Sequence, residues 1–226
     1  VWTLSRLRQP QLRDAAEAIR TTDTFTKTAI RRVRVDGAWV TVAGMAKGSG
    51  MIEPRMATML SYVFTDAAVG APHLRRLVKT TADATYNRLS VDGETSTSDT
   101  FLCFANGLAG NRPIRSARSP GADAFARALR EVCEQLVRDL ARDGEGATKL
   151  VTIDVRGAAT AAQAELAARR IATSPLVKTA LFGRDPNWGR IVQTLGAGRV
   201  KLREQAMRVK LCGVPVFENG AGTGPG

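Results

Sequence analysis

Apolar side chains recur every three or four residues in several stretches of the chain, which is the spacing of an amphipathic helix. The clearest stretch is 122–141, where one apolar stripe is formed by Phe125, Leu129, Val132, Leu136 and Leu140. The same spacing predicts helices over residues 11–20, 72–89, 159–173 and 187–195.

Alternating and β-branched runs predict strands between these helices. The runs 29–35 and 38–43 are joined by Asp36-Gly37, a pair that tolerates the positive φ values of a two-residue hairpin turn. A glycine-rich loop is expected over 44–54. Further strands are predicted over residues 58–65, 101–105, 149–155, 207–211 and 214–217.

Strands and helices come in blocks along the chain rather than in strict alternation. This order favours an α+β fold, with a sheet and helices in layers, over a doubly wound parallel sheet.

The chain of 226 residues has a single histidine, His73. One imidazole excludes multi-histidine zinc sites, and a histidine triad would depend on this one position. Because His73 follows Pro72 at the start of a predicted helix, we expect it on the surface.

Three cysteines form no CxxC pair, which argues against a disulfide framework and fits a reducing, cytoplasmic compartment. No apolar run is long enough to span a membrane, and the first ten residues lack the apolar core of a signal peptide.

The formal net charge is +12, and residues 1–34 and 184–210 hold most of the excess. In the first segment Arg31, Arg32 and Arg34 are interleaved with valines, as on a strand with one solvated face. We interpret the excess as a solvated surface or an attraction for small anionic substrates, with no nucleic-acid partner. Nucleic-acid binding is the rival interpretation.

Thr58 stands where the glycine-rich loop becomes a strand, and this position allows nucleophilic chemistry without a histidine. If the Ala57–Thr58 bond is cut, the free α-amine of Thr58 serves as its own general base. Such an amine titrates near roughly 7.7–8.0, close to working pH. The loop is not a nucleotide-binding P-loop, because Lys47 is followed by Gly48 rather than by Ser or Thr.

Seven motifs, in order along the chain, resemble those of the ornithine acetyltransferase family of arginine biosynthesis. They are residues 21–24 (TTDT), 44–51 (GMAKGSGM), 54–60 (PRMATML), 90–100 (SVDGETSTSDT), 143–149 (DGEGATK), 174–180 (SPLVKTA) and 185–190 (DPNWGR).

The resemblance implies a layered fold of the self-processing acetyltransferase/aminopeptidase type and a precursor that cleaves itself between Ala57 and Thr58. Residues 1–57 would then end an α chain, and residues 58–226 would form a β chain that begins at the nucleophile. Thr58 takes the acetyl group from N-acetylornithine as an ester and passes it to glutamate. Some members also use acetyl-CoA as a co-substrate, and no cofactor or metal is implied. The resemblance also implies a heterotetramer of α and β chains.

By the same resemblance, Lys47 binds a substrate carboxylate, Glu145 contacts the amino end of the substrate, and Thr21 supplies another contact. An amino-acid substrate carries both charges, so a cation and an anion at a fixed separation suit it. Outside the motifs, both would be interpreted as solvated surface residues.

Three acidic residues, Asp92, Glu94 and Asp99, lack the spacing of a calcium loop. We expect them to serve as turn and hydrogen-bonding residues. Trp188 is expected to be a packing residue.

Two parts of the family's site have no counterpart in this sequence. The Thr-Gly oxyanion element is expected upstream of Arg20, and the C-terminal substrate contacts are expected beyond the last hairpin. We therefore expect a partial chain. Two alternatives stay open: a Thr-dependent amidohydrolase or aminopeptidase of the same fold, and a non-catalytic remnant that binds a partner or nucleic acid through its basic segments.

Overall fold

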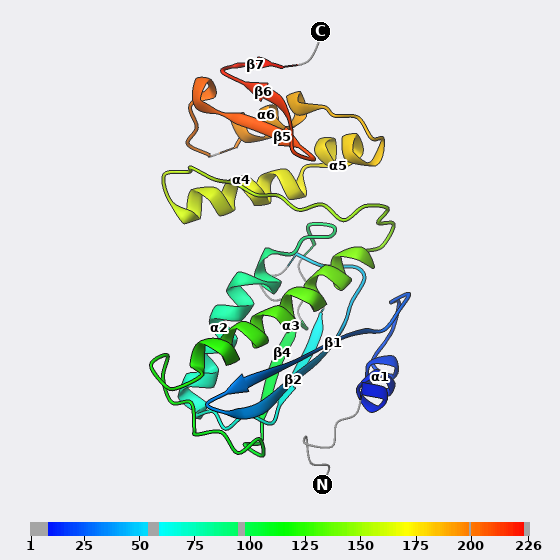
Figure 1. The fold of residues 1–226 in the computed structure, drawn as a ribbon. Helices are drawn as coiled ribbons and strands as arrows, with labels where there is room; N and C mark the ends of the chain where they lie inside the picture. Colours follow the sequence, from blue (N-terminus) through cyan, green and yellow to red (C-terminus); the bar gives the residue numbers. More distant parts are fainter. Residues whose placement is uncertain (1–8, 54–58, 95–97, 199, 224–226) are drawn as a thin grey trace. The chain divides into compact units, whose positions relative to one another are not determined.

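A computed structural model describes residues 9–53, 59–94, 98–198 and 200–223 (Figure 1). The chain divides into two compact units, residues 1–147 and residues 148–226. Each unit has its own apolar core.

The first unit is built on a four-stranded sheet in the order β1-β2-β3-β4 (Figure 1). Strands β1 (Lys27–Val35) and β2 (Ala38–Lys47) form the predicted hairpin, with φ values of 49° at Asp36 and 83° at Gly37. Strand β3 (Leu60–Thr65) pairs antiparallel with β2 and parallel with β4 (Thr100–Ala105). The boundary expected between α and β chains therefore falls between two neighbouring strands of one sheet.

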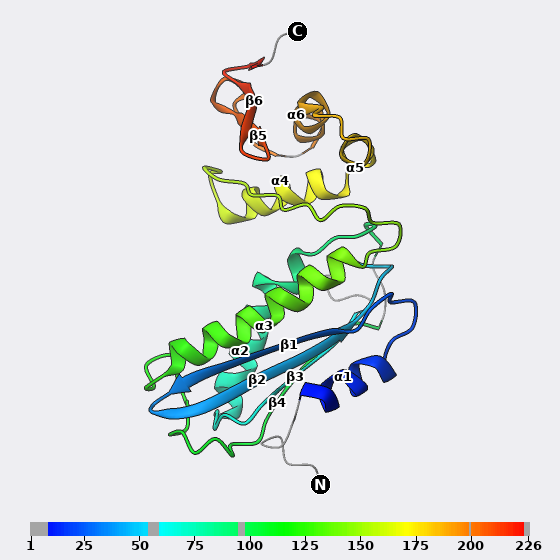
Figure 2. The same cartoon turned by 45° about the vertical axis from the view of Figure 1, so that its right-hand side comes forward.

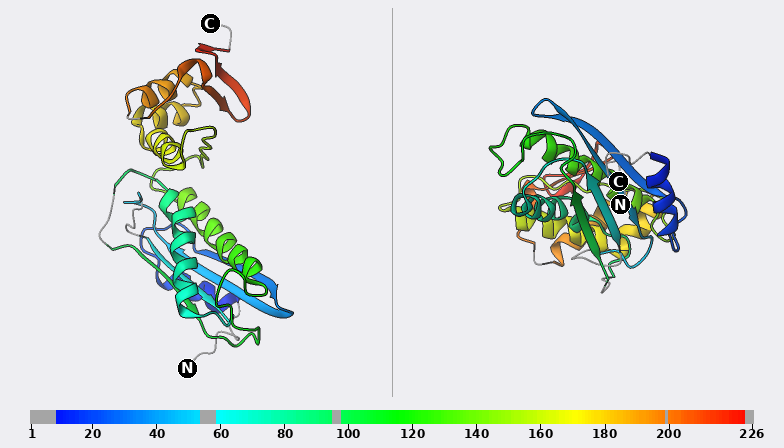
Figure 3. Two further views of the ribbon diagram at one scale, coloured as in Figure 1. Left: turned by 90° about the vertical axis from the view of Figure 1, so that its left-hand side faces the viewer. Right: turned by 90° about the horizontal axis from the view of Figure 1, so that it is seen from below.

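Helices cover both faces of this sheet. Helices α2 (Ala71–Ala84) and α3 (Ala122–Arg142) lie side by side on one face, and α1 (Gln9–Ala18) packs on β1 and β2 from the other (Figures 2 and 3). A short 3₁₀ turn, η2 (Tyr86–Arg88), follows α2. The predicted stripe of α3 is fully buried in the main core: Phe125, Leu129, Val132, Leu136 and Leu140.

Gly44 explains how closely β2 approaches α3. A Cβ at this position would lie 2.8 Å from Val132 Cγ1 and 2.9 Å from Leu136 Cδ1, closer than packed carbon atoms approach. The absence of a side chain therefore lets the strand and the helix pack in direct contact.

The second unit combines three helices with a small sheet. Its helices are α4 (Ala161–Thr173), α5 (Pro175–Phe182) and α6 (Trp188–Gly196), followed by the 3₁₀ turn η3 (Glu204–Ala206). Its sheet is formed by β5 (Arg208–Leu211), β6 (Val214–Glu218) and β7 (Ala221–Gly222). The Trp188 and Phe217 rings pack with centroids 4.9 Å apart, which confirms the packing role expected for Trp188.

The α+β class is confirmed, but two local predictions were wrong and one helix was not predicted. Residues 44–47 belong to β2, and the loop begins only at Gly48, because Gly44 is needed inside the strand. Residues 149–155 form no strand, since no strand of either sheet pairs with them. The helix predicted over 159–173 does end at Thr173, but a helix over 175–182 was not predicted. It begins at Ser174-Pro175, where the Ser174 hydroxyl accepts from the Val177 amide and proline suits the first helical turn.

His73 is also placed differently from the prediction. Only 5% of it is exposed, because it lies on the buried side of α2 with Thr81 and Ala82. Its Nδ1 lies 3.4 Å from Arg76 Nη2, and no described residue contacts Nε2 by a hydrogen bond. Burial, with Arg76 nearby, lowers the pKa of His73.

Of the arginines of β1, Arg32 and Arg34 are exposed, as predicted, whereas Arg31 has the strand parity of buried Val35 and lies on the face that α3 covers. The guanidinium carbons of Arg32 and Arg34 lie 4.9 and 5.1 Å from the centroid of the Trp39 ring. Arg31 pairs with Glu131 at 3.2 Å. Two of the three arginines in this basic cluster therefore make cation–π contacts with an exposed tryptophan.

All three cysteines are free thiols. Within the described ranges, no helix is both long enough and apolar enough to cross a bilayer.

Candidate functional site

The three substrate-binding residues predicted from sequence meet at one end of the four-stranded sheet. Lys47 is the last residue of β2, and its Nζ lies 3.5 Å from Thr21 Oγ1, in the segment that leads into β1. Glu145 follows α3, and its backbone amide donates to the carbonyl of Ser49 at 2.7 Å. Segments more than a hundred residues apart in sequence therefore contribute to one polar surface.

Gly50 makes room for the carboxylate of Glu145. A Cβ on Gly50 would lie 2.7 Å from Glu145 Oε2, so the carboxylate rests against the backbone of the loop that follows Lys47. The arrangement places one cation and one anion on either side of a glycine-rich turn.

The two threonines before β1 have different partners. Thr22 Oγ1 lies 2.6 Å from Ser49 Oγ, and Ser49 is 3% exposed. Thr21 instead faces Lys47. Both threonines are exposed, but the hydroxyl of Thr21 is the one beside the lysine, while Thr22 ties its segment to the loop.

Beneath this surface lies a buried ion cluster that the sequence analysis did not identify. Lys27 Nζ, at the start of β1, donates to Asp23 Oδ1 at 2.6 Å and to Asp143 Oδ2 at 2.5 Å. The side chain of Lys27 is 0% exposed, and those of the two aspartates are 0% and 1% exposed. A buried ammonium between two carboxylates is paired on both sides, as such a charge requires.

The cluster also holds the backbone of the surrounding loops. Asp23 accepts from the amide of Gly48 at 2.6 Å and from that of Thr21 at 3.4 Å. Asp143 accepts from both the amide and the hydroxyl of Thr24. Burial alone would raise the pKa of Asp23, but the hydrogen bonds from Lys27 and Gly48 outweigh it and lower this pKa. The ionised cluster therefore fixes the segments that carry Thr21, Lys47 and Glu145.

The predicted nucleophile Thr58 and its cleavage partner Ala57 lie outside the described residues. The chain is described again from Met59, which is 1% exposed, and Leu60 pairs in register with Lys47. The start of β3 therefore lies at the same end of the sheet as Lys47.

Of the acidic residues between 90 and 100, Asp92 and Asp99 serve as hydrogen-bond acceptors, as predicted. Asp92 accepts from the amides of Met51 at 2.6 Å and Ile52 at 3.0 Å, and Asp99 accepts from the amide of Met59 at 2.5 Å. Among the described residues, no group of three or more His, Cys, Asp or Glu side chains is arranged to hold a metal ion.

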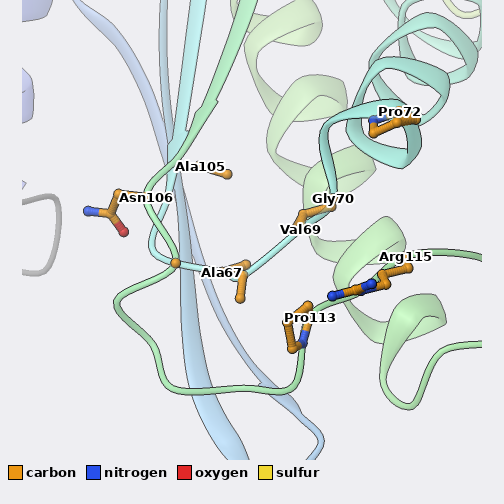
Figure 4. Close-up of a pocket in the computed structure, with 10 residues that line it drawn as sticks. Ala67, Val69, Gly70, Pro72, Ala105, Asn106, Pro113 and Arg115 are labelled. Atoms are coloured by element: carbon orange, nitrogen blue, oxygen red, sulfur yellow. The ribbon is translucent and has the colours of Figure 1, made fainter.

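A separate cavity of about 560 Å³ lies at the opposite end of the sheet, where β3 and β4 end (Figure 4). Its lining is mostly small and apolar, with Asn106 and Arg115 as polar side chains. None of the predicted site residues lines it.

Comparison with known proteins gives one consistent result. The sequence model described as "ArgJ family" matches residues 3–225. The arginine biosynthesis bifunctional protein ArgJ of Symbiobacterium thermophilum is 51% identical over 210 residues, which are 90% of this chain and 52% of that protein. The protein of the same name from Bradyrhizobium diazoefficiens is 48% identical, over 92% of this chain and 51% of its own length.

The structure is similar to the crystal structure of the arginine biosynthesis bifunctional protein argJ from Bacillus halodurans. The TM-score is 0.72 at 38% sequence identity, and the match covers 75% of this chain and 79% of that one. The chain spans about half the length of the curated relatives it matches.

Proposed function

The chain belongs to the ArgJ family, and from this premise we propose that it acts in arginine biosynthesis as a glutamate N-acetyltransferase. It transfers the acetyl group of N-acetylornithine to glutamate through an ester on Thr58. The observation that carries the proposal is the convergence of Thr21, Lys47 and Glu145 beside the strand that follows Thr58.

The charges of this surface suit an amino-acid substrate. The ammonium of Lys47 binds a substrate carboxylate, and the carboxylate of Glu145 binds the amino group at the other end. Thr21 adds a hydroxyl beside the lysine. Because the buried cluster around Lys27 holds all three segments, the two charges keep a fixed separation before the substrate arrives.

The chemistry needs no histidine. The hydroxyl of Thr58 first attacks the carbonyl carbon of Ala57, so that an ester replaces the peptide bond and the nitrogen of Thr58 becomes a free amine. Water then releases the preceding chain. In each turnover this amine takes the proton of the Thr58 hydroxyl as it attacks the acetyl carbonyl of N-acetylornithine, and ornithine leaves. The amine of glutamate next attacks the acetyl ester and regenerates Thr58.

Cleavage gives an α chain that ends at Ala57 and a β chain that begins at Thr58, and two copies of each form a heterotetramer. Acetyl-CoA is a second acetyl donor to be tested, since the curated relatives are named bifunctional.

The test is made in the complete reading frame that contains residues 1–226. Mass spectrometry of freshly purified wild type should reveal a fragment that begins at Thr58. Thr58→Ser keeps a hydroxyl and should still be cleaved, whereas Thr58→Ala should stay intact. An intact wild-type chain would overturn the proposal.

Acetyl transfer is assayed separately. Cleaved wild type should form N-acetylglutamate from N-acetylornithine only when glutamate is present. Release of free acetate at the same rate without glutamate would instead identify a hydrolase of the amidohydrolase or aminopeptidase type.

A further inference from the structure

The loop that follows Lys47 contains a strained residue close to Glu145. Met51 has a φ of 52°, in the left-handed region that residues other than glycine seldom adopt, and its side chain is 51% exposed. A backbone conformation of this kind persists only where the surrounding contacts enforce it. The contacts of Met51 therefore identify the residues that fix this turn.

Asp92 supplies the enforcing contact. Its carboxylate accepts the amide of Met51 on Oδ2 at 2.6 Å and the amide of Ile52 on Oδ1 at 3.0 Å. Successive backbone amides that converge on one anion form a nest, so the strained turn and the carboxylate suit each other. Ile52 is fully buried, and its carbonyl accepts from the Val91 amide at 2.6 Å. The segment that carries Asp92 thus anchors the turn to the core.

The same turn supports Glu145 on its other side. The carbonyl of Ser49 accepts from the Glu145 amide at 2.7 Å, and a Cβ on Gly50 would lie 2.7 Å from Glu145 Oε2. Gly50 and Met51 share one planar peptide unit, so an acceptor that fixes the Met51 amide also fixes the carbonyl and the α-carbon of Gly50. Asp92 and Glu145 are therefore coupled through the backbone of the turn.

The two amino-acid substrates of the proposed reaction differ at the end that faces Glu145. With its α-carboxylate on Lys47, N-acetylornithine presents the ammonium of its side chain to Glu145, and the opposite charges attract. Glutamate held in the same way presents a second carboxylate, which a fixed anion repels. A rigidly held Glu145 therefore favours the acetyl donor over the acetyl acceptor.

We propose that Asp92 is a positioning residue for the donor half of the cycle. By accepting the amides of Met51 and Ile52, it holds the turn that sets the Glu145 carboxylate for the side-chain ammonium of N-acetylornithine. The inference rests on the proposed function. Asp92 acts through the turn, and no bond forms or breaks on it.

The two halves of a ping-pong cycle can be measured separately. The value of kcat/KM for N-acetylornithine reports the steps up to the release of ornithine, and kcat/KM for glutamate reports the remaining steps. The ratio of the two values is the readout, because misfolded or uncleaved protein lowers both by the same factor.

Two substitutions at Asp92 and one control are made in the complete reading frame. Asp92→Ala removes both acceptor oxygens, whereas Asp92→Asn keeps one. Asp66→Ala is the matched control, because Asp66 also accepts a backbone amide, that of Thr41 at 2.7 Å, at the other end of the same sheet.

We expect kcat/KM for N-acetylornithine to fall by about tenfold in Asp92→Ala, the effect of a weakened hydrogen bond to a charged group, and by less in Asp92→Asn. The value for glutamate should be unchanged or higher, because a displaced Glu145 repels glutamate less. Asp66→Ala should change neither value. In a Glu145→Ala background, Asp92→Ala should lower the donor value no further.

An unchanged ratio of the two values in Asp92→Ala would overturn this inference and leave the proposed function intact. A further fall in the Glu145→Ala background would do the same, because Asp92 would then act independently of Glu145. Loss of cleavage in both Asp92 variants would also overturn it, since Asp92 would then act before the donor binds. Wild type that stays intact, or that forms no N-acetylglutamate, would overturn the proposed function itself.

Discussion

Lys27 Nζ donates to Asp143 Oδ2 across 116 positions of the sequence, and neither side chain is more than 1% exposed. The same ammonium donates to Asp23, four residues earlier. One buried lysine thus ties the start of β1 to the turn after α3, and the proposed substrate residues lie on the segments that it joins.

Replacing Lys27 by Met should destabilise the first unit strongly. The substitution leaves two buried carboxylates without their cation, a loss of about 3–5 kcal/mol for a broken buried pair. Lys79→Met is the matched control, because Lys79 and Asp83 are also four residues apart but are 78% and 52% exposed. It should change the free energy of unfolding by less than about 0.5 kcal/mol. Urea unfolding measures both, and equal losses would contradict the role given to Lys27.

Replacing Gly50 by Ala should impair substrate binding with little effect on folding. The new methyl group would meet the Glu145 carboxylate, the far end of a flexible side chain that can turn away. We expect KM for N-acetylornithine to rise by about tenfold, the value of one hydrogen bond to a charged group. The free energy of unfolding should change by less than about 1 kcal/mol.

A double-mutant cycle makes this prediction specific. In a Glu145→Ala background, Gly50→Ala should raise KM no further, since the displaced group is already absent. Additive effects of the two substitutions would show that Gly50 acts independently of Glu145.

The close contact between β2 and α3 predicts opposite effects for two identical substitutions. Gly44→Ala forces a methyl group between Val132 and Leu136 and should destabilise the protein by about 1–3 kcal/mol. Gly196→Ala, at the end of α6 with open space around it, should be neutral or stabilising by up to about 1 kcal/mol. Thermal unfolding of both variants checks the pair, and a tolerated Gly44→Ala would contradict the packing.

His73 should make stability depend on pH. Its pKa is lowered in the folded protein, so the folded state binds fewer protons than the unfolded state, whose histidine titrates near roughly 6.5. The stability contributed by the neutral ring is complete above that value and is lost as the pH falls below it. The free energy of unfolding is measured with urea at about pH 7.5 and about pH 5, on either side of this titration. Between these two pH values it should fall less for His73→Gln than for wild type. If the free energy of unfolding depended on pH in the same way in both proteins, His73 would have no part in the pH dependence.

The fold class could be predicted from sequence, because it rests on local patterns. The stripe of α3 and the Asp36-Gly37 turn fix one helix and one hairpin. The motifs indicated Thr21, Lys47 and Glu145, and the structure brings the segments that carry them together, while their role as substrate contacts stays a prediction. The strand predicted at 149–155 failed because alternation describes a chain's own conformation but not whether a partner strand exists.

Lys27 escaped prediction for a related reason. A signal was present: Lys27 has the same strand parity as buried Ala29, and an aspartate stands four residues before it. Its second partner, Asp143, comes close only through the packing of α3 on β1. His73 was misplaced because a lone polar residue at a helix start gives no indication of which way the helix will turn.

The ladder between β2 and β3, from Val42 opposite Thr65 to Lys47 opposite Leu60, crosses the proposed cut. A break at Ala57–Thr58 removes one covalent bond but none of these pairings. The two products should therefore separate on a denaturing gel yet elute together from a native sizing column. The chain can thus be cut here while the sheet stays intact. The new amine is released without the sheet having to open.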